Sequence, residues 1–384
     1  MRRASGIHIA AFAAMATFTQ IAHADNSVTL YGIIDTGIDF VNNSGGSHLW
    51  QMRDGTYAGI YGSRWGLKGN EDLGGGWATL FRIENGFSLE NGQLRQGGLG
   101  FGRQAYVGLS NDRLGTVTFG RQYDSIVDYI APTTLPGNLG GMFVHAGDID
   151  NTSNSFRVNN SVKYASPNLG GFSFGGVYAF TNSNTADAAT TGMWSAGANY
   201  SASGLTLAVG YLFARNPGQL FADGNFVPNT TGAAIGATGP FSYVGQPRNQ
   251  QVIGAGATYV MGHVTVGADY TNVKFDDANG TTQSVRFDNY EVWGQYAITP
   301  AATVGGGYTF TDGKVNYNGA TPKYHQIGLL LDYKLSKRTE AYLMGAFQRA
   351  AGSAIHAAIL DGAIGDASST NKQLATRIGL VHKF

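Results

Sequence analysis

The chain ends on Leu374-Ala-Thr-Arg-Ile-Gly-Leu-Val-His-Lys-Phe384, a stretch in which two kinds of side chain alternate. One face carries Leu374, Thr376, Ile378, Leu380, His382 and Phe384, and the other carries Ala375, Arg377, Gly379, Val381 and Lys383. A period of two is that of a β-strand. The first face suits lipid, the second suits water, and the terminal aromatic falls where an interfacial girdle would lie. The stretch therefore predicts a strand of a membrane-spanning β-barrel.

The same alternation recurs in the interior of the chain, at residues 171–180, 263–271 and 327–335. In the second segment Val264, Val266 and Tyr270 oppose Thr265 and Asp269, and in the third Leu330 is the one apolar side chain on the polar face. A soluble β-sandwich would also alternate, with its apolar face as the core. The polar face here is rich in Gly, Thr, Asn and single charges, which favours a barrel with a wet interior.

Connections of two lengths alternate along the chain. Short ones lie near residues 72–76, 111–115, 167–171, 201–204, 261–263, 299–302 and 336–338. Longer ones span roughly residues 42–57, 89–100, 124–156, 181–190, 215–249, 276–284, 312–321 and 351–370. Seven short and eight long connections join sixteen strands. We therefore expect an all-β fold, a 16-stranded antiparallel transmembrane β-barrel with tight periplasmic turns, long external loops and both termini in the periplasm.

A barrel of this size leaves an aqueous channel, and its closure pairs every backbone polar group in lipid. The sequence after residue 24 has no apolar run approaching 18 residues, so we expect no membrane-spanning helix there.

Residues 1–24 have the pattern of an export signal. Arg2 and Arg3 give a charged start, residues 7–18 an apolar middle, and Ala22-His23-Ala24 a small-x-small cleavage site. An N-terminal membrane anchor is the alternative, but the apolar part is shorter than the ~20 residues that a spanning helix needs. We expect a mature barrel domain over residues 25–384, in the outer membrane of a Gram-negative bacterium.

Composition excludes several kinds of chemistry. Removing Arg2 and Arg3 from the 25 basic residues leaves 23 against 25 acidic ones, a net charge of −2. Nucleic-acid binding needs a clustered positive surface, so we expect no nucleic-acid partner. Without cysteine, an exported chain forms no disulfide.

Five motifs, in order along the chain, resemble one family. They are Ser27-Val-Thr-Leu-Tyr-Gly-Ile-Ile-Asp35, Ser63-Arg-Trp-Gly-Leu-Lys-Gly-Asn-Glu-Asp-Leu73, Arg103-Gln-Ala-Tyr-Val-Gly-Leu109, Phe119-Gly-Arg-Gln-Tyr-Asp124 and Gly379-Leu-Val-His-Lys-Phe384. Together they resemble the trimeric general-diffusion porins of β-proteobacteria, of the neisserial and Burkholderia type. The resemblance covers the whole mature chain.

The resemblance implies a homotrimer in outer-membrane lipid and lipopolysaccharide, through which small hydrophilic solutes and ions diffuse passively. It also implies that the third external loop folds into the pore, opposite a ladder of basic wall residues. Phe384 resembles the signal that barrel-assembly machinery reads, with periplasmic chaperones acting during biogenesis.

Alternation places several charged side chains in the lumen. Residues 78–87 turn Arg82 and Glu84 inward. Residues 157–164 put Val158, Val162 and Tyr164 outward, and Arg157, Asn159, Ser161 and Lys163 inward. Arg64, Lys68 and the acids Asp35 and Asp39 follow from parity, whereas Arg103 and Arg121 follow from the resemblance.

The expected basic ladder comprises Arg64, Lys68, Arg82, Arg103, Arg121, Arg157 and Lys163, and the pore-lining acids are Asp35 and Glu84. A lipid-facing Arg or Lys would cost ~2–4 kcal/mol at the midplane. The alternative is that these are solvated lumen charges without a special role.

The third loop, residues 124–156, is too apolar to be solvated freely. We expect residues 126–143 to pack on the inner wall, the alternative being a loop across the barrel mouth. The expected constriction residues are Asp124, Asp128, Pro136, Gly137, Gly140, Gly141, Asp148 and Asp150.

One departure from enterobacterial relatives bears on ion selectivity. Their third loop resembles Leu-Pro-Glu-Phe-Gly-Gly-Asp, whereas this chain reads Leu135-Pro-Gly-Asn-Leu-Gly-Gly141. The aligned acids are missing while the basic ladder is kept, which predicts a mild preference for anions. Asp128, Asp148 or Asp150 could supply a substitute acid.

Signals of catalysis or metal binding are weak. Gly171-Phe-Ser-Phe-Gly175 fits the nucleophile-elbow pattern, but Ser173 lies in the middle of a predicted strand. Asp148-Ile-Asp150-Asn lacks the glycine and closing glutamate of a calcium loop, and the six mature histidines have no metal-ligand spacing. We expect no enzyme activity, no cofactor and no metal.

Three functional classes remain: a passive diffusion channel, a substrate-specific channel for a sugar or organic anion, and an enzyme or adhesin anchored by the barrel. A sugar channel would show a run of inward aromatics, whereas Tyr31 and Trp293 are scattered. An anchor would need a catalytic constellation or a passenger domain, and the barrel uses the whole mature chain. The passive channel is the prediction.

Overall fold

The computed structural model describes residues 27–181, 192–220 and 239–384. The predicted export signal, residues 1–24, lies outside the described residues, as do most of the predicted loop 181–190 and part of the loop 215–249. None of the described helices is long and apolar enough to cross a membrane.

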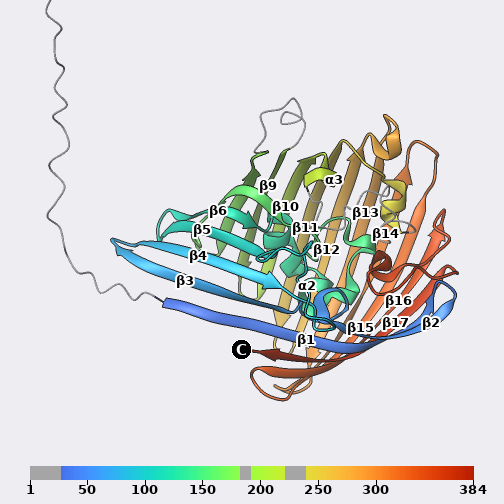
Figure 1. Ribbon diagram of the computed structural model, residues 1–384, viewed down its shortest axis with the longest axis horizontal. Helices are drawn as coiled ribbons and strands as arrows, with labels where there is room; N and C mark the ends of the chain where they lie inside the picture. Colours follow the sequence, from blue (N-terminus) through green and yellow to red (C-terminus); the bar gives the residue numbers. More distant parts are fainter. Residues whose placement is uncertain (1–26, 182–191, 221–238) are drawn as a thin grey trace, which may run out of the picture.

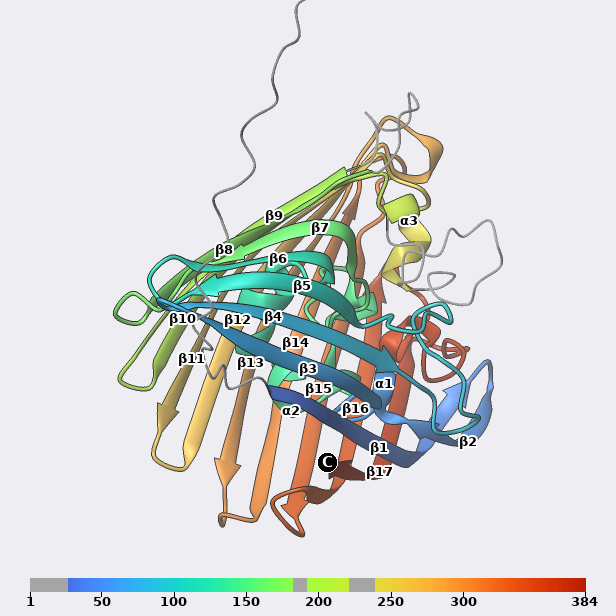
Figure 2. The ribbon, with the colours of Figure 1, turned by 60° about the vertical axis from the view of Figure 1, so that its left-hand side comes forward.

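The chain forms one antiparallel sheet that closes on itself (Figures 1 and 2). Closure is made by β1 and β17, which pair from Ile33↔Lys383 to Val41↔Ala375. The strands are β1 Ser27–Ser44, β2 Ser47–Asp54, β3 Arg64–Gly74, β4 Trp77–Gly86, β5 Gln104–Asn111, β6 Gly115–Gln122, β7 Val158–Ala165, β8 Phe172–Ala179, β9 Gly192–Ala202, β10 Leu205–Arg215, β11 Asn249–Met261, β12 Val264–Asp276, β13 Val285–Ala297, β14 Ala302–Val315, β15 Pro322–Lys334, β16 Thr339–Gly352 and β17 Lys372–Lys383.

Seventeen strand segments occupy sixteen positions around the barrel. The first half of β1 pairs with β3 and the second half with β2, on the same edge. Between them lies α1, Gly55–Ala58. The sixteen-stranded prediction is therefore confirmed. The prediction of a loop over residues 42–57 was wrong, because β1 extends to Ser44 and half of the segment is the strand β2.

Each of the seven predicted short connections is a short turn in the structure, and the turn between β1 and β2 adds another that was not predicted. The turn between β3 and β4 shows why such turns are glycine-rich: Gly74, Gly75 and Gly76 all have positive φ, at 82°, 62° and 80°. Side chains with a Cβ rarely adopt this conformation.

The predicted division of β17 into two faces is confirmed. Ile378 is 62% exposed and Leu380 46% exposed on the outer face, whereas Ala375, Arg377 and Val381 are at most 1% exposed. The inner face of this strand is therefore packed against protein.

The predicted parity of β7 was wrong at one residue. Val158 is buried in the same inner cluster as Ile126 and Phe156, although alternation from Val162 placed it outside. Between the pairs Gly120↔Ser161 and Gln122↔Val158, two residues of β7 oppose one of β6, and one of the two, Asn160, has a φ of 51°. This β-bulge adds one residue, which reverses the face of Val158.

Loop 3, residues 123–157 between β6 and β7, folds into the barrel as predicted. It contains a π-helical turn at Ile126–Ile130, 3₁₀ turns at Ala131–Thr133, Gly141–Phe143 and Ala146–Asp148, and α2 at Leu135–Leu139. Other short helical segments are α3 Pro217–Leu220, Pro240–Tyr243, Ala278–Gly280 and Ile359–Gly362.

Apolar side chains of loop 3 pack against the inner wall. Ile126, Ile130, Leu135, Leu139, Met142 and Phe143 are each at most 1% exposed. Each such side chain contributes roughly 1.5–3 kcal/mol when it leaves water. The wall is hollowed by glycines where the loop lies, since a Cβ at Gly254 or Gly305 would collide with Ile130 or Leu139.

Candidate functional site

A passage of about 360 Å³ remains between loop 3 and the facing wall. Three arginines line it: Arg64 of β3, Arg103 just before β5, and Arg157 just before β7. The other side is formed by loop 3, including the predicted residues Pro136, Gly137, Gly141 and Asp148. Part of the rim comes from residues 55–62 around α1 and from Leu360 and Ala363 of the loop after β16. The passage is therefore bordered by loop 3 on one side and by three arginines on the other.

Glu84 is the acid at the basic wall. Its carboxylate accepts from Arg103 Nε at 2.7 Å and from the Tyr31 hydroxyl at 2.8 Å, and Arg64 Nε lies 3.9 Å away. Arg103 also donates to the Tyr123 hydroxyl at 3.1 Å. One carboxylate thus faces two guanidinium groups, which leaves an excess of positive charge beside the passage.

Lys68 and Arg82 extend the positive surface along the same wall. The Lys68 ammonium and the Arg82 guanidinium lie 5.4 Å and 5.8 Å from the centre of the Tyr31 ring. Both cations therefore lie beside Tyr31, whose hydroxyl is bonded to Glu84.

The remaining basic residues differ in their surroundings. The Arg157 guanidinium lies 5.9 Å from the Tyr123 ring centre. Lys163 forms an ion pair with Asp128 of loop 3. Arg121 donates to the Gly102 carbonyl at 2.8 Å and to Asn159 Oδ1 at 2.6 Å, and it is not among the side chains that line the passage in the described part of the chain.

Asp35 is fully buried, unlike the pore-lining acid that we expected. It accepts from the Tyr342 hydroxyl at 2.6 Å and from the Tyr61 amide at 2.8 Å. Arg377, also buried, donates to Asp39 at 2.7 Å and lies 3.6 Å from Asp35. The residues around α1 cover this network, so Asp35 helps to close the seam between β1 and β17 and does not contact the solvent of the lumen.

The four predicted acids of loop 3 lie in two places. Asp124 caps the start of the loop, accepting from the Ile126 amide at 2.7 Å and from Asn151 Nδ2 at 2.6 Å. Burial raises the pKa of Asp124 to about 6, and Asp128 adds to the rise. Burial likewise raises the pKa of Asp128, and the positive charge of Lys163 offsets part of this rise.

Asp148 lines the passage, and Asp150 is buried behind it. Burial and the neighbouring Asp150 raise the pKa of Asp148 to about 7, and its carboxylate accepts from the Ser153 amide at 2.8 Å. Gly140, with a φ of 127°, is buried where α2 ends, and a Cβ there would lie 3.1 Å from Met344 Cε.

Two inward aromatics that could have marked a sugar path serve other purposes. Trp293 donates from Nε1 to the Thr133 carbonyl of loop 3 at 2.8 Å, and Tyr31 is hydrogen-bonded to Glu84. The hydrogen bond of Trp293 fixes loop 3, and that of Tyr31 fixes the Glu84 carboxylate at the basic wall.

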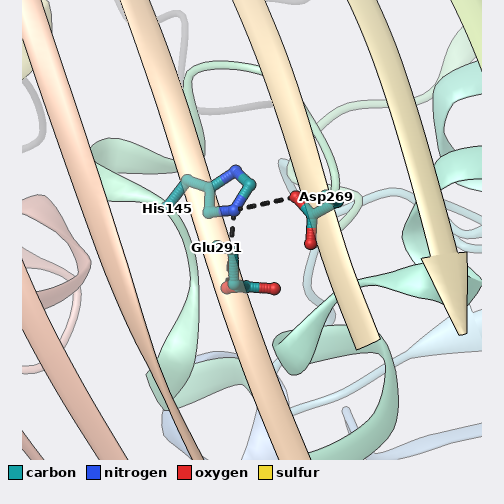
Figure 3. Close-up of side chains that lie close together, drawn as sticks. All are labelled: His145, Asp269 and Glu291. Carbon is teal, nitrogen blue, oxygen red and sulfur yellow. Dashed lines mark ion pairs between the residues drawn. The ribbon is translucent and has the colours of Figure 1, made fainter. Parts of the chain in front are cut away.

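A cluster of four buried side chains was missed by the sequence reasoning. Nδ1 of His145, in loop 3, lies 2.5 Å from Asp150. Its Nε2 lies 3.3 Å from Asp269 and 3.4 Å from Glu291 (Figure 3). Alternation put Asp269 inside the barrel, but only the register of β12 with β13 brings Glu291 beside it.

Phe384 completes the closing seam. Its amide donates to the Gly32 carbonyl at 3.0 Å, and its carbonyl accepts from the Gly32 amide at 3.1 Å. Its ring lies over Gly32, where a Cβ would come 2.8 Å from Cε1.

Comparisons with known proteins agree with this architecture. The sequence profile of the family described as Gram-negative porin matches residues 10–353. An outer membrane porin protein of Bordetella pertussis is 31% identical over 400 residues, covering 97% of this chain and 98% of that protein. Outer membrane porin protein 32 of Delftia acidovorans is 28% identical over 379 residues, covering 94% and 95%.

Two solved structures show the same fold. The anion-selective porin from Comamonas acidovorans superposes with a TM-score of 0.74 at 24% identity, over 94% of this chain and 100% of that chain. OmpT of Vibrio cholerae in a trimer form superposes with a TM-score of 0.69 at 17% identity, over 94% and 99%.

Proposed function

Because this chain belongs to the Gram-negative porin family, we propose that its channel passes small hydrophilic solutes and ions by passive diffusion, with a mild preference for anions. The family and the closed barrel make it an outer-membrane protein that forms a water-filled channel. The same two findings indicate a channel and not an enzyme.

The observation that carries the anion preference is the charge around the passage. Arg64, Arg103 and Arg157 line it, while residues 135–141 of the opposite side contain no acid. Fixed charges in a narrow, low-dielectric passage act on permeating ions more strongly than they would in bulk water. That a relative of the same fold is described as anion-selective supports this assignment.

A salt-gradient measurement tests the preference. Purified protein in a planar bilayer, between dilute and concentrated KCl, should give a reversal potential of the sign that chloride sets. A reversal potential that potassium sets would mean that Asp148 and the other loop acids dominate, and it would contradict the proposal.

The functional unit in this proposal is a homotrimer, for which the likeness to the neisserial type of porin and the trimer form of OmpT are the support. Unheated detergent gels should show a band that converts to monomer on heating, with a trimer mass by light scattering. A monomer in both measurements would exclude the trimer.

Both termini and the short turns face the periplasm in this proposal. The chain has no cysteine, so single-cysteine variants allow clean labelling. In intact cells an impermeant maleimide should label Asn318→Cys, in a long loop, and leave Lys337→Cys, in a short turn, unlabelled until the cells are lysed. The reverse pattern would invert the topology.

A further inference from the structure

Asp269 of β12 and Glu291 of β13 stand directly opposite each other in the strand register. Both side chains are buried inside the barrel, at 7% and 2% exposure. Like charges directly opposite each other destabilise a strand pair, and burial increases the cost. A positive charge between the two carboxylates offsets this cost, and His145 Nε2 lies within ion-pair distance of both, at 3.3 Å and 3.4 Å.

We propose that His145, Asp269 and Glu291 bind a divalent metal ion of the zinc class, which fastens loop 3 to β12 and β13 (Figure 3). The three side chains converge from the loop and from two wall strands. One potential ligand atom from each lies within 4.8 Å of the other two.

Buried atoms without hydrogen bonds point to a ligand at this place. Within the described residues, His145 Nε2 and both carboxylate oxygens of Asp269 are buried and accept or donate no hydrogen bond. Asp269 has an ion pair with His145 but no hydrogen bond, and native proteins leave few buried carboxylates without hydrogen bonds. A metal ion would satisfy all of these atoms together.

Two of the three ligand separations match a tetrahedral ion. Nε2 of His145 lies 3.3 Å from Asp269 Oδ1 and 3.4 Å from Glu291 Oε2. Two ligands at about 2.0–2.1 Å from a tetrahedral zinc ion are about 3.3 Å apart. An imidazole with two carboxylates is also a donor set that suits zinc better than magnesium or calcium, which prefer oxygen alone.

The surroundings orient the three ligands. Asp150 contacts His145 Nδ1 at 2.5 Å, so the opposite nitrogen can face a metal, and Asp150 itself accepts from Thr271 Oγ1 at 2.5 Å. Glu291 accepts from Thr309 Oγ1 at 3.0 Å. A carboxylate behind a histidine ligand fixes the ring and raises its basicity, as is usual for metal-bound histidine.

Such an ion would act on the constriction. Val144, Gly147 and Asp148, which flank His145 in the chain, line the passage. Clamping His145 to two wall strands would hold this part of loop 3 in place and so stabilise the width of the passage.

Metal content and thermal stability test the proposal in the intact protein. Protein stripped with a chelator and dialysed against zinc should retain one ion per subunit by mass spectrometry, and zinc should raise its melting temperature in detergent. Asp269→Asn is the decisive variant, because it loses no hydrogen bond and exchanges the ion pair with His145 for relief of the like-charge contact with Glu291. Its metal-free form should fold at least as stably as the wild type, yet retain no zinc.

Two further variants sharpen the result. Asp150→Asn should weaken zinc binding about 10–100-fold, as expected of a carboxylate that supports a histidine ligand. His263→Gln, at an exposed histidine in a turn, should bind zinc as the wild type does. If stripped wild-type protein takes up no more zinc than Asp269→Asn, or if zinc raises both melting temperatures equally, the site does not exist.

Discussion

The ring of Phe143 lies against Gly328, so that a Cβ at residue 328 would come 2.8 Å from ring atom Cε1 and closer still to Cδ1. Phe143 belongs to loop 3 and is fully buried, and Gly328 is in the middle of β15. The pair shows how a chain rich in glycine uses that residue in the wall. The missing side chains leave space in which the loop packs.

Gly328→Ala should therefore displace loop 3. The ring of Phe143 is fully buried, and overpacking of a buried side chain costs about 1–3 kcal/mol. We expect a lower melting temperature in detergent and an altered single-channel conductance.

Gly294→Ala is the matched control. This glycine lies on β13, and a Cβ there would meet its nearest atom at 3.6 Å, which is ordinary contact. Conductance and melting temperature should stay close to the wild type. Equal effects of the two substitutions would show that the loop does not depend on the hollow in the wall.

Arg157→Glu should shift the reversal potential toward cations, because it reverses one of the three arginine charges that line the passage. The shift should shrink at salt well above ~0.15 M, where the Debye length falls below about 8 Å. Lys337→Glu, in an exposed turn, should change the reversal potential little. Similar shifts from both variants would place the selectivity outside the passage.

Deleting Phe384 should reduce the amount of assembled barrel in the outer membrane while leaving synthesis and export intact. The deletion removes two backbone hydrogen bonds to Gly32 and the ring that covers it. Phe384→Tyr keeps both features and should assemble normally. Quantitative immunoblots of heat-modifiable protein in outer-membrane fractions check this, and wild-type levels after the deletion would refute it.

Asp124 should make stability depend on pH between about 4 and 6. Its folded pKa of about 6 lies above the ordinary value of 3.8, mainly because the carboxyl is buried. The folded state therefore holds more protons than the unfolded state in this window. The free energy of unfolding falls as pH rises through the window, by up to about 1.4 kcal/mol per pH unit, and is constant with respect to this group above it.

Asp124→Asn removes this dependence. The difference in unfolding free energy between wild type and variant, measured with guanidinium in detergent, should decline from pH 4 to pH 6 and then level off. Asp112→Asn, in an exposed turn, should leave the pH profile of the wild type unchanged. A constant difference between wild type and Asp124→Asn across the window would exclude the titration of Asp124.

The fold class followed from local features of the sequence. Side chains alternate with a period of two wherever one face of a strand meets lipid, and turns separate one strand from the next. Both patterns can be recognised in a stretch of about ten residues. The outer face of β17 and the seven short turns were predicted in this way. The apolar character of residues 126–143 was likewise enough to place loop 3 against the wall.

The charged interior was predicted less well. Alternation states which face a side chain is on, but not what covers that face. Asp35 and Arg377 are both inward as parity requires, yet the segment around α1 buries them in a closed network. One extra residue in β7, which no local pattern announces, reversed the face of Val158.

The sequence by itself determined the lipid-facing surface, the number of strand positions and the inward fold of loop 3. Each of these depends on whether a side chain is polar or apolar, and therefore on whether it prefers water, lipid or protein. The tertiary structure alone decided which inward charges border water and which pair with each other. Asp269 and Glu291 meet because of strand register, and His145 joins them from a loop more than a hundred residues earlier. Contacts of this kind, between residues far apart in the sequence, depend on closure of the whole barrel and on the packing of the loop. No local stretch of sequence encodes either.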